Sequence, residues 1–320
     1  MGANAVVVGY GRSLHTRIFH CDAIKNTEGL NLYGICARNP QFQEEARKAY
    51  GVKVYPSFAE VLADEQVDLV AISTPSYCHA EMAIQALNAG KHVAVEKPMC
   101  LRVSEAEAMI EAARERGRIL TTRHNRRWDS DFLTVRKVLS EGKISPVFLL
   151  HIAYTDLLKP TGWRAQRGTG GGVIYDLGSH LIDQALQLVS APPLSVFAFT
   201  GPWAWDVESE TYARVLLRFA DGSAADIELS HNSWIPRPRW YVLGSQGSLV
   251  SEKGKFLLRT KAGPEELELI PAVKEGFYTN VAQALQGKAK VAVTPEESKL
   301  VIRIIEAAFR SAESGKAVDL

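Results

Sequence analysis

The sequence has few cysteines and no excess of charge of either sign. The cysteines are Cys21, Cys36, Cys78 and Cys100; none forms a C-x-x-C pair, and none lies at zinc-finger spacing from a histidine. We therefore expect free buried thiols in a reducing compartment and no metal site. The 37 lysines and arginines balance 36 aspartates and glutamates. Because a DNA-binding protein needs a basic excess to neutralise phosphates, we expect no nucleic-acid partner.

Long apolar runs are also missing. Runs such as Val67–Ile72, which contains Asp68, are far shorter than the roughly 20 residues of a membrane helix. The strand-like run Ala5–Gly9 comes too early to leave room for a signal peptide. We therefore expect no membrane partner and a cytoplasmic location. The remaining composition, 46% hydrophobic and 23% charged over 320 residues, is typical of a globular protein of about two domains.

The first part of the sequence alternates strand-like and helix-like patterns. We predict strands at Asn4–Val8, Leu30–Ala37, Val52–Tyr55, Val67–Ser73, His92–Glu96 and Ile119–Thr122. Helical spacing and capping residues predict helices at Leu14–Ile24, Pro40–Tyr50, Phe58–Leu62, Tyr77–Asn88 and Ser104–Gly117. This alternation implies βαβ crossovers, so we predict an α/β domain over residues 1–122 with a parallel sheet covered on both faces.

The pattern changes in residues 123–320, which we predict to form an α+β domain. Expected strands are Val147–Thr155, Leu194–Thr200, Thr211–Phe219, Ala224–His231 and Trp240–Leu243, with helices at Asp129–Leu139, Val173–Leu188 and Glu296–Ser314. Hairpin turns at Asp221-Gly222 and Gly244–Gly247 predict a mostly antiparallel, open sheet. The helices suffice for one face only. We expect the face with Val215, Leu217 and Phe219 to stay open and to form a homo-oligomer, most simply a dimer or tetramer.

Two features of the first domain indicate a dinucleotide. Gly9-Tyr10-Gly11 ends the first strand and opens a helix, where glycines let the backbone approach a pyrophosphate. The third glycine of this fingerprint is replaced by Leu14. The second strand ends in Ala37-Arg38, without the acidic residue that accepts hydrogen bonds from the ribose of NAD. Arg38 can hold a 2′-phosphate instead, so NADP(H) is favoured and NAD(H) remains possible.

Two further motifs carry groups suited to proton transfer. Lys97 follows the fifth strand, whose carboxyl end faces the ligand crevice in parallel sheets. A lysine there suits acid–base work, although a surface lysine before Pro98 fits the same pattern. Asp176 and His180 are four residues apart in a predicted helix, so the carboxylate can orient the imidazole. An ordinary pair on a solvated helix face is the alternative.

Together, these motifs resemble the glucose–fructose oxidoreductase, inositol dehydrogenase and rhizopine-catabolism family, abbreviated Gfo/Idh/MocA. The resemblance extends over nearly the whole chain. It rests on Gly9-Tyr10-Gly11, Ser73-Thr74-Pro75 with His79, Ala89–Val93 leading into Glu96-Lys97-Pro98, and Tyr175–Asp183. The stretch Asn125–Asp129 and the Gly247-Ser248 turn are similar to one branch of the family. The turn after Gly11 is about two residues longer than usual, so Arg12 or His15 could take a binding role.

The resemblance implies an N-terminal Rossmann domain, a doubly wound parallel sheet, and a C-terminal α+β domain with an open sheet. It implies that Lys97, Asp176 and His180 match the catalytic trio of the family. It also implies NAD(P)-dependent oxidation or reduction of a secondary alcohol on a sugar, cyclitol or related polyol. The cofactor-binding residues that we predict are Gly9, Tyr10, Gly11, Arg12, Ser13, Arg38, Ser73, Thr74, Pro75, His79, Glu96 and Lys97.

The substrate is expected to be a small carbohydrate-like molecule. Lys97, Asp176 and His180 are predicted to contact it, together with Trp163 and Arg164, because a tryptophan face stacks on sugar rings and arginine donates in a rigid fork. Two other functions fit the same motifs. One is a dinucleotide-binding regulator without turnover. The other is a redox-neutral, glycoside-cleaving enzyme that keeps and recycles its cofactor.

Overall fold

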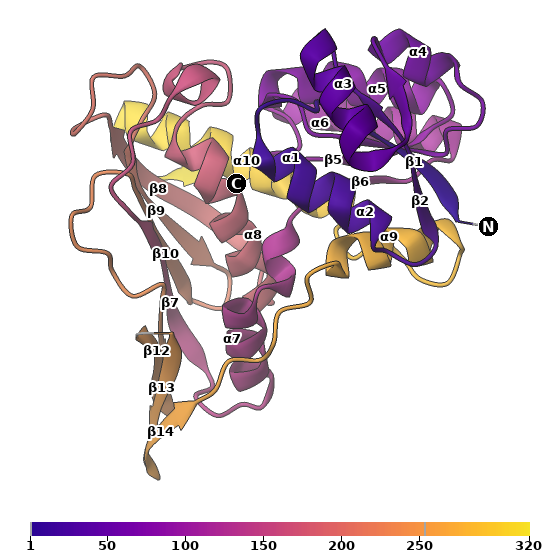
Figure 1. Ribbon diagram of the computed structural model, residues 1–320. Helices are drawn as coiled ribbons and strands as arrows, with labels where there is room; N and C mark the ends of the chain where they lie inside the picture. The colour runs from indigo at the N-terminus through magenta and orange to yellow at the C-terminus, as the bar shows by residue number, and fades with distance from the viewer. Residues whose placement is uncertain (1, 253) are drawn as a thin grey trace. The chain divides into compact units, whose positions relative to one another are not determined.

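A six-stranded parallel sheet is the centre of the first of two units in this computed structural model, which describes residues 2–252 and 254–320 (Figure 1). Unit 1 consists of residues 2–125 and 274–299. Its strands are β1 Ala3–Val8, β2 Leu30–Cys36, β3 Lys53–Tyr55, β4 Leu69–Ile72, β5 His92–Val95 and β6 Leu120–Thr122, in the order β3-β2-β1-β4-β5-β6. This is the doubly wound order of a Rossmann domain, as predicted.

The structure has a helical segment at each predicted helix of unit 1, some with shifted ends. The helix predicted to open with a cap at Ser104 begins instead at Val103, behind Arg102. The helical segments of unit 1 are α1 Leu14–Thr16, a π-type segment Arg17–Asp22, α2 Ala23–Lys25, α3 Pro40–Tyr50, α4 Phe58–Ala63, a 3₁₀ turn Ser76–Cys78, α5 His79–Asn88, α6 Val103–Arg116 and α9 Gly276–Leu285. At α3, the Asn39 side chain accepts a hydrogen bond from the amide of Gln41, and Pro40 begins the helix. The segment with α9 belongs to unit 1 although it lies 150 residues beyond the predicted boundary at residue 122.

Unit 2, residues 126–273 and 300–320, is built on a nine-stranded sheet. Its strands are β7 Val147–Thr155, β8 Pro193–Gly201, β9 Tyr212–Phe219, β10 Ala224–Ser230, β11 Trp240–Gly244, β12 Gly247–Glu252, β13 Lys255–Thr260, β14 Gly263–Leu267 and β15 Val318–Asp319, in the order β14-β13-β12-β11-β7-β10-β9-β8-β15. Neighbours pair antiparallel except β7 and β10. The predicted turns at Asp221-Gly222 and Gly244–Gly247 join β9 to β10 and β11 to β12. The mostly antiparallel sheet is thus confirmed.

Helices of unit 2 lie along one face of this sheet (Figure 1). They are α7 Ser130–Ser140, α8 Ser179–Leu188 and the part of α10 Pro295–Ser314 that belongs to this unit; short turns are Asn125–Trp128 and Gly162–Ala165. The segment Ile174–Gly178 that leads into α8 is a π-helix, so the predicted helix Val173–Leu188 is not uniformly α. In residues 2–252 and 254–320, no helix combines the length and apolar character needed to cross a membrane.

The open face of the sheet is opposite to the one expected. Val215 and Leu217 of β9 are fully buried, and Phe219 is 1% exposed, whereas Leu216 between them is 42% exposed. The expectation that the Val215 face stays open is therefore wrong. The more apolar face of β9 is the one that the helices cover, because burying it removes more apolar surface from water.

Candidate active site

The ends of β1 and β4 lie side by side at the point where the strand order of unit 1 reverses. Ligands of doubly wound sheets bind at this point. Gly9 follows β1 with a φ of 103°, and a Cβ at this position would overlap the carbonyl oxygen of Ser73. Only glycine combines this backbone conformation with this close approach. The backbone at position 9 therefore requires glycine whether or not a ligand is bound.

A hollow of about 940 Å³ opens next to this turn. It is lined by Val8, Gly9, Tyr10, Gly11, Cys36, Ala37, Arg38, Asn39, Pro40, Phe42, Pro56, Ser57, Phe58, Thr74, Pro75, Tyr77, Cys78 and Met82. Six predicted cofactor-binding residues are in this set: Gly9, Tyr10, Gly11, Arg38, Thr74 and Pro75. The hollow combines the Gly9-Tyr10-Gly11 turn, apolar side chains and the exposed Arg38, which fits the adenosine and phosphate groups of a dinucleotide.

The six other predicted cofactor residues, Glu96 and Lys97 among them, are not part of the hollow's lining. Arg12 is exposed and Ser13 precedes α1. The Ser73 hydroxyl pairs with Thr16 at 3.0 Å. His79 is 1% exposed, and its ring nitrogens lie 2.8 Å from the Pro98 oxygen and 2.9 Å from the Thr74 oxygen. His79 thus ties the loop after β4 to the loop after β5, which holds Lys97.

Glu96 is the centre of a buried polar cluster at the end of β5. Its Oε1 accepts hydrogen bonds from His20 Nε2 at 2.9 Å and from Arg123 at 2.8 Å, and its Oε2 accepts one from the Lys97 amide at 3.1 Å. The other ring nitrogen of His20 lies 2.5 Å from the Tyr278 hydroxyl. Burial raises the pKa of Glu96, but Arg123 and His20 outweigh it and hold this pKa well below its usual range. Glu96 is thus a charged group that fixes the backbone of Lys97.

The lengthened turn after Gly11 brings His15 to the same cluster. His15, His20 and Glu96 offer ligand atoms within 4.8 Å of one another, an arrangement that could hold a metal ion and that the sequence did not predict. Burial lowers the pKa of His15 to about 4, so its imidazole is neutral. Arg123 already donates a hydrogen bond to the Glu96 carboxylate at 2.8 Å. A cation beside this guanidinium is electrostatically unfavourable, and we assign no metal to the cluster.

In unit 2, three of the predicted substrate residues, Trp163, Arg164 and Asp176, form a connected group. The Arg164 side chain stacks on the Trp163 ring, with 4.4 Å between the guanidinium carbon and the ring centroid. Arg164 Nε also donates to Asp176 Oδ2 at 3.1 Å. Arg164 is half exposed and Asp176 is one-fifth exposed. The group therefore offers an aromatic face, a guanidinium and a carboxylate to the solvent side of this unit.

His180 lies in the first turn of α8 and is 6% exposed. Asp176 precedes it in the π-helix Ile174–Gly178. A π-type turn inside a helix is frequent at functional sites, because it changes the direction in which side chains project. Asp183, which the sequence places near the same helix face, forms a buried two-point ion pair with Arg127 at 2.5 and 2.9 Å. Asp183 is therefore a structural carboxylate.

Comparisons with known proteins agree with this architecture. The profile of an oxidoreductase family with an NAD-binding Rossmann fold matches residues 3–124. The profile of the Gfo/Idh/MocA C-terminal domain matches residues 132–250. The chain belongs to the Gfo/Idh/MocA oxidoreductase family. The protein is therefore an oxidoreductase, and the family is consistent with NAD(P)-dependent action on CH–OH groups.

Relatives within this family match nearly the full chain. A scyllo-inositol 2-dehydrogenase (NADP⁺) of Bacillus subtilis is 31% identical over 98% of this chain and 95% of its own length. An uncharacterised oxidoreductase of Schizosaccharomyces pombe is 40% identical over 98% of both chains. The crystal structure of an NAD-binding protein from Listeria innocua has a TM-score of 0.91 at 30% identity, and the match covers 100% of this chain and 99% of that one.

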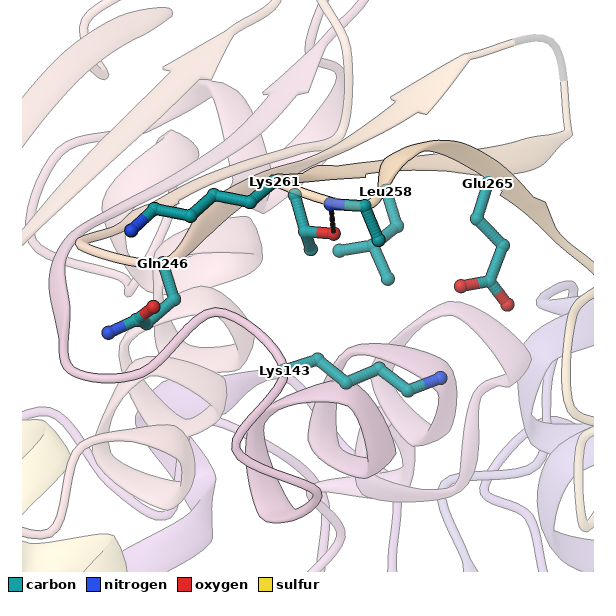
Figure 2. Close-up of a pocket in the computed structure, with 7 residues that line it drawn as sticks. Lys143, Gln246, Leu258, Lys261 and Glu265 are labelled. Atoms are coloured by element: carbon teal, nitrogen blue, oxygen red, sulfur yellow. Dashed lines mark hydrogen bonds between the residues drawn. The ribbon is translucent and has the colours of Figure 1, made fainter.

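Another hollow of the protein lies on unit 2 (Figure 2). Lys143, Gln246, Lys261 and Glu265 surround it, and the Ala262 amide donates to Thr260 Oγ1 at 3.2 Å. These long side chains are exposed. The hollow includes none of the predicted site residues, so we do not connect it with the reaction.

Several site residues are not obtained from motifs. Asn39, Ser57 and Tyr77 line the hollow next to the Gly9 turn, and each follows the end of a parallel strand. These residues could have been predicted from the sequence, because ligands of doubly wound sheets bind at the carboxyl ends of the strands. Tyr278 could not be found in this way, because its helix α9 joins unit 1 from a distant part of the sequence.

Proposed function

We propose that this oxidoreductase transfers a hydride between a nicotinamide cofactor and a secondary alcohol or ketone of a sugar, cyclitol or related polyol. The observation that supports this proposal most strongly is the presence of Lys97, Asp176 and His180 on a Gfo/Idh/MocA fold. Trp163 and Arg164 lie next to Asp176. The name of the B. subtilis relative, a scyllo-inositol dehydrogenase, supports a cyclic polyol. Aromatic stacking and a charged fork are suited to a ring with many hydroxyl groups.

Each of the three catalytic residues has a separate role in this proposal. The bound cofactor supplies or accepts the hydride at the nicotinamide ring. His180 takes the hydroxyl proton during oxidation and returns it during reduction. Lys97 donates a hydrogen bond to the same oxygen and stabilises its negative charge. Asp176 orients the other two groups, and Lys97 and His180 could exchange roles.

We propose NADP(H) as the favoured cofactor and NAD(H) as a weaker one. The second strand ends without an acidic residue, and exposed Arg38 lines the hollow there. Helix α3 begins two residues later, and a helix N-terminus also favours an anion. The NADP⁺ in the name of the B. subtilis relative supports this choice.

A substrate screen tests the function. Wild-type protein is mixed with inositols, aldoses, their ketones and anhydro-ketoses, each with NADP(H) and NAD(H), and nicotinamide absorbance is followed. We expect a steady absorbance change with at least one ring polyol or its ketone. Product formation without any net change in absorbance would indicate the redox-neutral reaction instead. Binding of cofactor with no turnover of any compound would favour a regulator.

We also propose that the protein is a homo-oligomer through the open face of the unit 2 sheet. A row of paired positions crosses seven strands of this face, from β8 to β13, and contains Phe197, Leu216, Tyr241 and Leu257, which are 38–42% exposed. His151, Asp226 and Arg214 lie among them and form ion pairs at 2.6 and 3.2 Å. A wide apolar face of this kind is normally covered by a partner. A dimer or tetramer would cover it.

Sedimentation tests the assembly. We expect wild type to sediment as a dimer or tetramer at micromolar concentration, and Leu216→Glu to shift it toward the monomer. Val273→Glu is the matched control, because Val273 is 50% exposed and lies outside the sheet. A wild-type monomer would overturn the proposal.

We further propose that the protein works in a reducing, cytoplasmic compartment. Cys21, Cys36, Cys78 and Cys100 are all free thiols in the structure. Reducing compartments keep thiols in this state. Thiol titration of freshly isolated protein without reductant should therefore give four thiols per chain.

A further inference from the structure

Residues 208–210 of unit 2 join the loop that holds Arg164 to the helix that holds Asp176. On the loop side, the amides of Glu208 and Ser209 donate to the Ala165 oxygen at 3.1 and 3.2 Å, and the Ser209 hydroxyl donates to the Arg164 oxygen at 2.9 Å. Each of these bonds fixes the backbone of the 3₁₀ turn Gly162–Ala165. The turn with Trp163 and Arg164 is thus anchored from outside itself.

On the helix side, Glu210 makes the connection. Its backbone oxygen accepts a hydrogen bond from the Val173 amide at 3.1 Å, and its Oε1 accepts one from the Ile174 amide at 3.0 Å. Amides in the first turn of a helix have no partner within the helix, so a side-chain acceptor stabilises that turn. Glu210 therefore caps the π-helix from a distant part of the sequence.

The space for the Glu210 carboxyl exists because residue 172 is glycine. Gly172 has a φ of 92°, and a Cβ there would overlap the carboxyl group of Glu210. The Gly172 amide donates to the Arg164 oxygen at 3.0 Å, and its own oxygen accepts from the Asp176 amide at 3.1 Å. The carboxyl thus lies against a residue whose backbone is hydrogen-bonded to both Arg164 and Asp176.

These contacts form a closed ring. Gly172 is hydrogen-bonded to the backbones of Arg164 and Asp176, and the Arg164 side chain closes the ring with its hydrogen bond to the Asp176 carboxylate. Glu210 is attached to this ring through its hydrogen bond from the Ile174 amide. Glu210 is thus connected through Gly172 and Ile174 to the segments that carry Asp176 and Arg164.

We propose that Glu210 is a positioning residue for the reaction, which sets the geometry of Asp176 and of the Trp163–Arg164 substrate face without touching the substrate. The inference rests on the proposed function. The Glu210 carboxyl is 5% exposed. Misplacing a substrate-binding group by about 1 Å can cost on the order of 10²-fold in rate.

The first test compares two substitutions of Glu210. Glu210→Ala removes the acceptor for Ile174, so kcat/KM should fall about 10- to 100-fold, with a rise in KM and a fall in kcat. Glu210→Gln keeps an amide oxygen at this place and should stay within about threefold of wild type. The dissociation constant of NADP(H), which binds to unit 1, should not change in either variant. Loss of activity in Glu210→Gln equal to that in Glu210→Ala would contradict positioning through this hydrogen bond.

A matched pair of glycine variants provides the second test. Gly172→Ala places a Cβ on the carboxyl, whereas Gly168→Ala, at a φ of 85°, has no atom within 4 Å of its Cβ. Both carry the same backbone strain. We expect Gly172→Ala to lose kcat/KM like Glu210→Ala, Gly168→Ala to remain within about threefold, and Gly172→Ala with Glu210→Ala to lose less than the sum. Equal effects of the two glycine variants would overturn the proposal. If Glu210→Ala does not fold, this pair decides alone.

The third readout does not require turnover. Hydrogen exchange of residues 163–178 should accelerate in Glu210→Ala, in both the Arg164 loop and the π-helix, and should be unchanged in His180→Ala. Unchanged exchange in Glu210→Ala means that Glu210 does not position these elements. Full activity in His180→Ala would instead overturn the catalytic assignment and leave the exchange result standing. The two failures are therefore distinguishable.

Discussion

Glu96 of unit 1 and Glu210 of unit 2 are both nearly inaccessible, and each is hydrogen-bonded to a segment that carries a predicted catalytic residue, but the two differ in charge. Glu96 of unit 1 is 6% exposed, is paired with Arg123 and His20, and has a pKa well below its usual range. Glu210 of unit 2 is 5% exposed, and burial raises its pKa to about 7, although the Ile174 amide and Arg167 oppose this shift. Similar burial thus gives opposite results, because a nearby cation decides whether a buried carboxyl keeps its charge.

The difference indicates two ways to hold a site in place. Glu96 accepts a hydrogen bond from the Lys97 amide, and its negative charge is neutralised by the Arg123 guanidinium. Glu210 fixes Ile174 with a carboxyl that is close to losing its charge at neutral pH. The first arrangement does not depend on pH in the physiological range. The second does, so pH and substitution at these sites should separate the two units.

The largest expected effect concerns the residues that these glutamates support. Lys97→Ala and His180→Ala should each lower kcat by roughly 10²–10⁴-fold, the usual loss for an acid–base group. Cofactor affinity should change much less. Steady-state kinetics with a good substrate and fluorescence titration with NADPH check both statements. A variant with near-wild-type kcat would remove that residue from the mechanism.

The next effect is on the charged centre of unit 1. Arg123→Met leaves Glu96 buried without its guanidinium, so unfolding free energy should fall by about 3–5 kcal/mol at pH 7. Arg114→Met is the control, because Arg114 forms an exposed pair with Glu111 and its loss should cost far less. Urea unfolding measures both. Equal losses would mean that the Glu96 charge is not held by Arg123.

Glu210 should have a smaller effect on the free energy of unfolding, and the direction in which this effect changes with pH is defined. Its folded-state pKa of about 7 lies above the unfolded value of 4.5. Folded protein therefore retains the proton longer, and stability falls as pH rises from 4.5 to 7, by about 3 kcal/mol over the whole window. Glu210→Gln removes this term, so the stability of the variant relative to wild type should rise with pH across the window. Urea unfolding at several pH values tests this, and a difference that does not vary with pH would contradict the raised pKa.

Cofactor choice should show the smallest effect. A charge-assisted hydrogen bond from Arg38 to a 2′-phosphate is worth about 1.5–3 kcal/mol, or roughly ten- to a hundred-fold in affinity. NADP(H) should therefore bind more tightly than NAD(H), and Arg38→Ala should remove most of the difference. Fluorescence quenching gives all four dissociation constants. Equal constants in the wild type would exclude Arg38 as the selector.

Local patterns were sufficient for much of the fold and for part of the site. Strand alternation, the helix start at Pro40 and the Gly9 turn are properties of short segments, and the structure has the corresponding elements in place. The alternation in β9 also separated the two faces correctly. It did not say which one the helices cover, and the assignment of Val215 to the open face was wrong.

Features that depend on distant segments were not predicted. Strands β12, β13 and β14 and helix α9 were missed, and α9 brings Tyr278 to His20 over 258 positions of sequence. The Glu210 carboxyl accepts a hydrogen bond from the π-helix before His180 and lies against Gly172, which is 38 positions away in the sequence. The raised pKa of Glu210 has the same origin, since burial is created by tertiary packing.

The central claim is that this chain moves a hydride between a nicotinamide and a polyol carbon. NADPH with deuterium at the transferable position of C4 tests it directly, with the ketone found in the substrate screen. We predict one deuterium on the new carbinol carbon for each NADP⁺ formed, detected by mass spectrometry, and no transfer with Lys97→Ala and His180→Ala combined. Product without deuterium, or turnover without net oxidation of NADPH, would contradict the account.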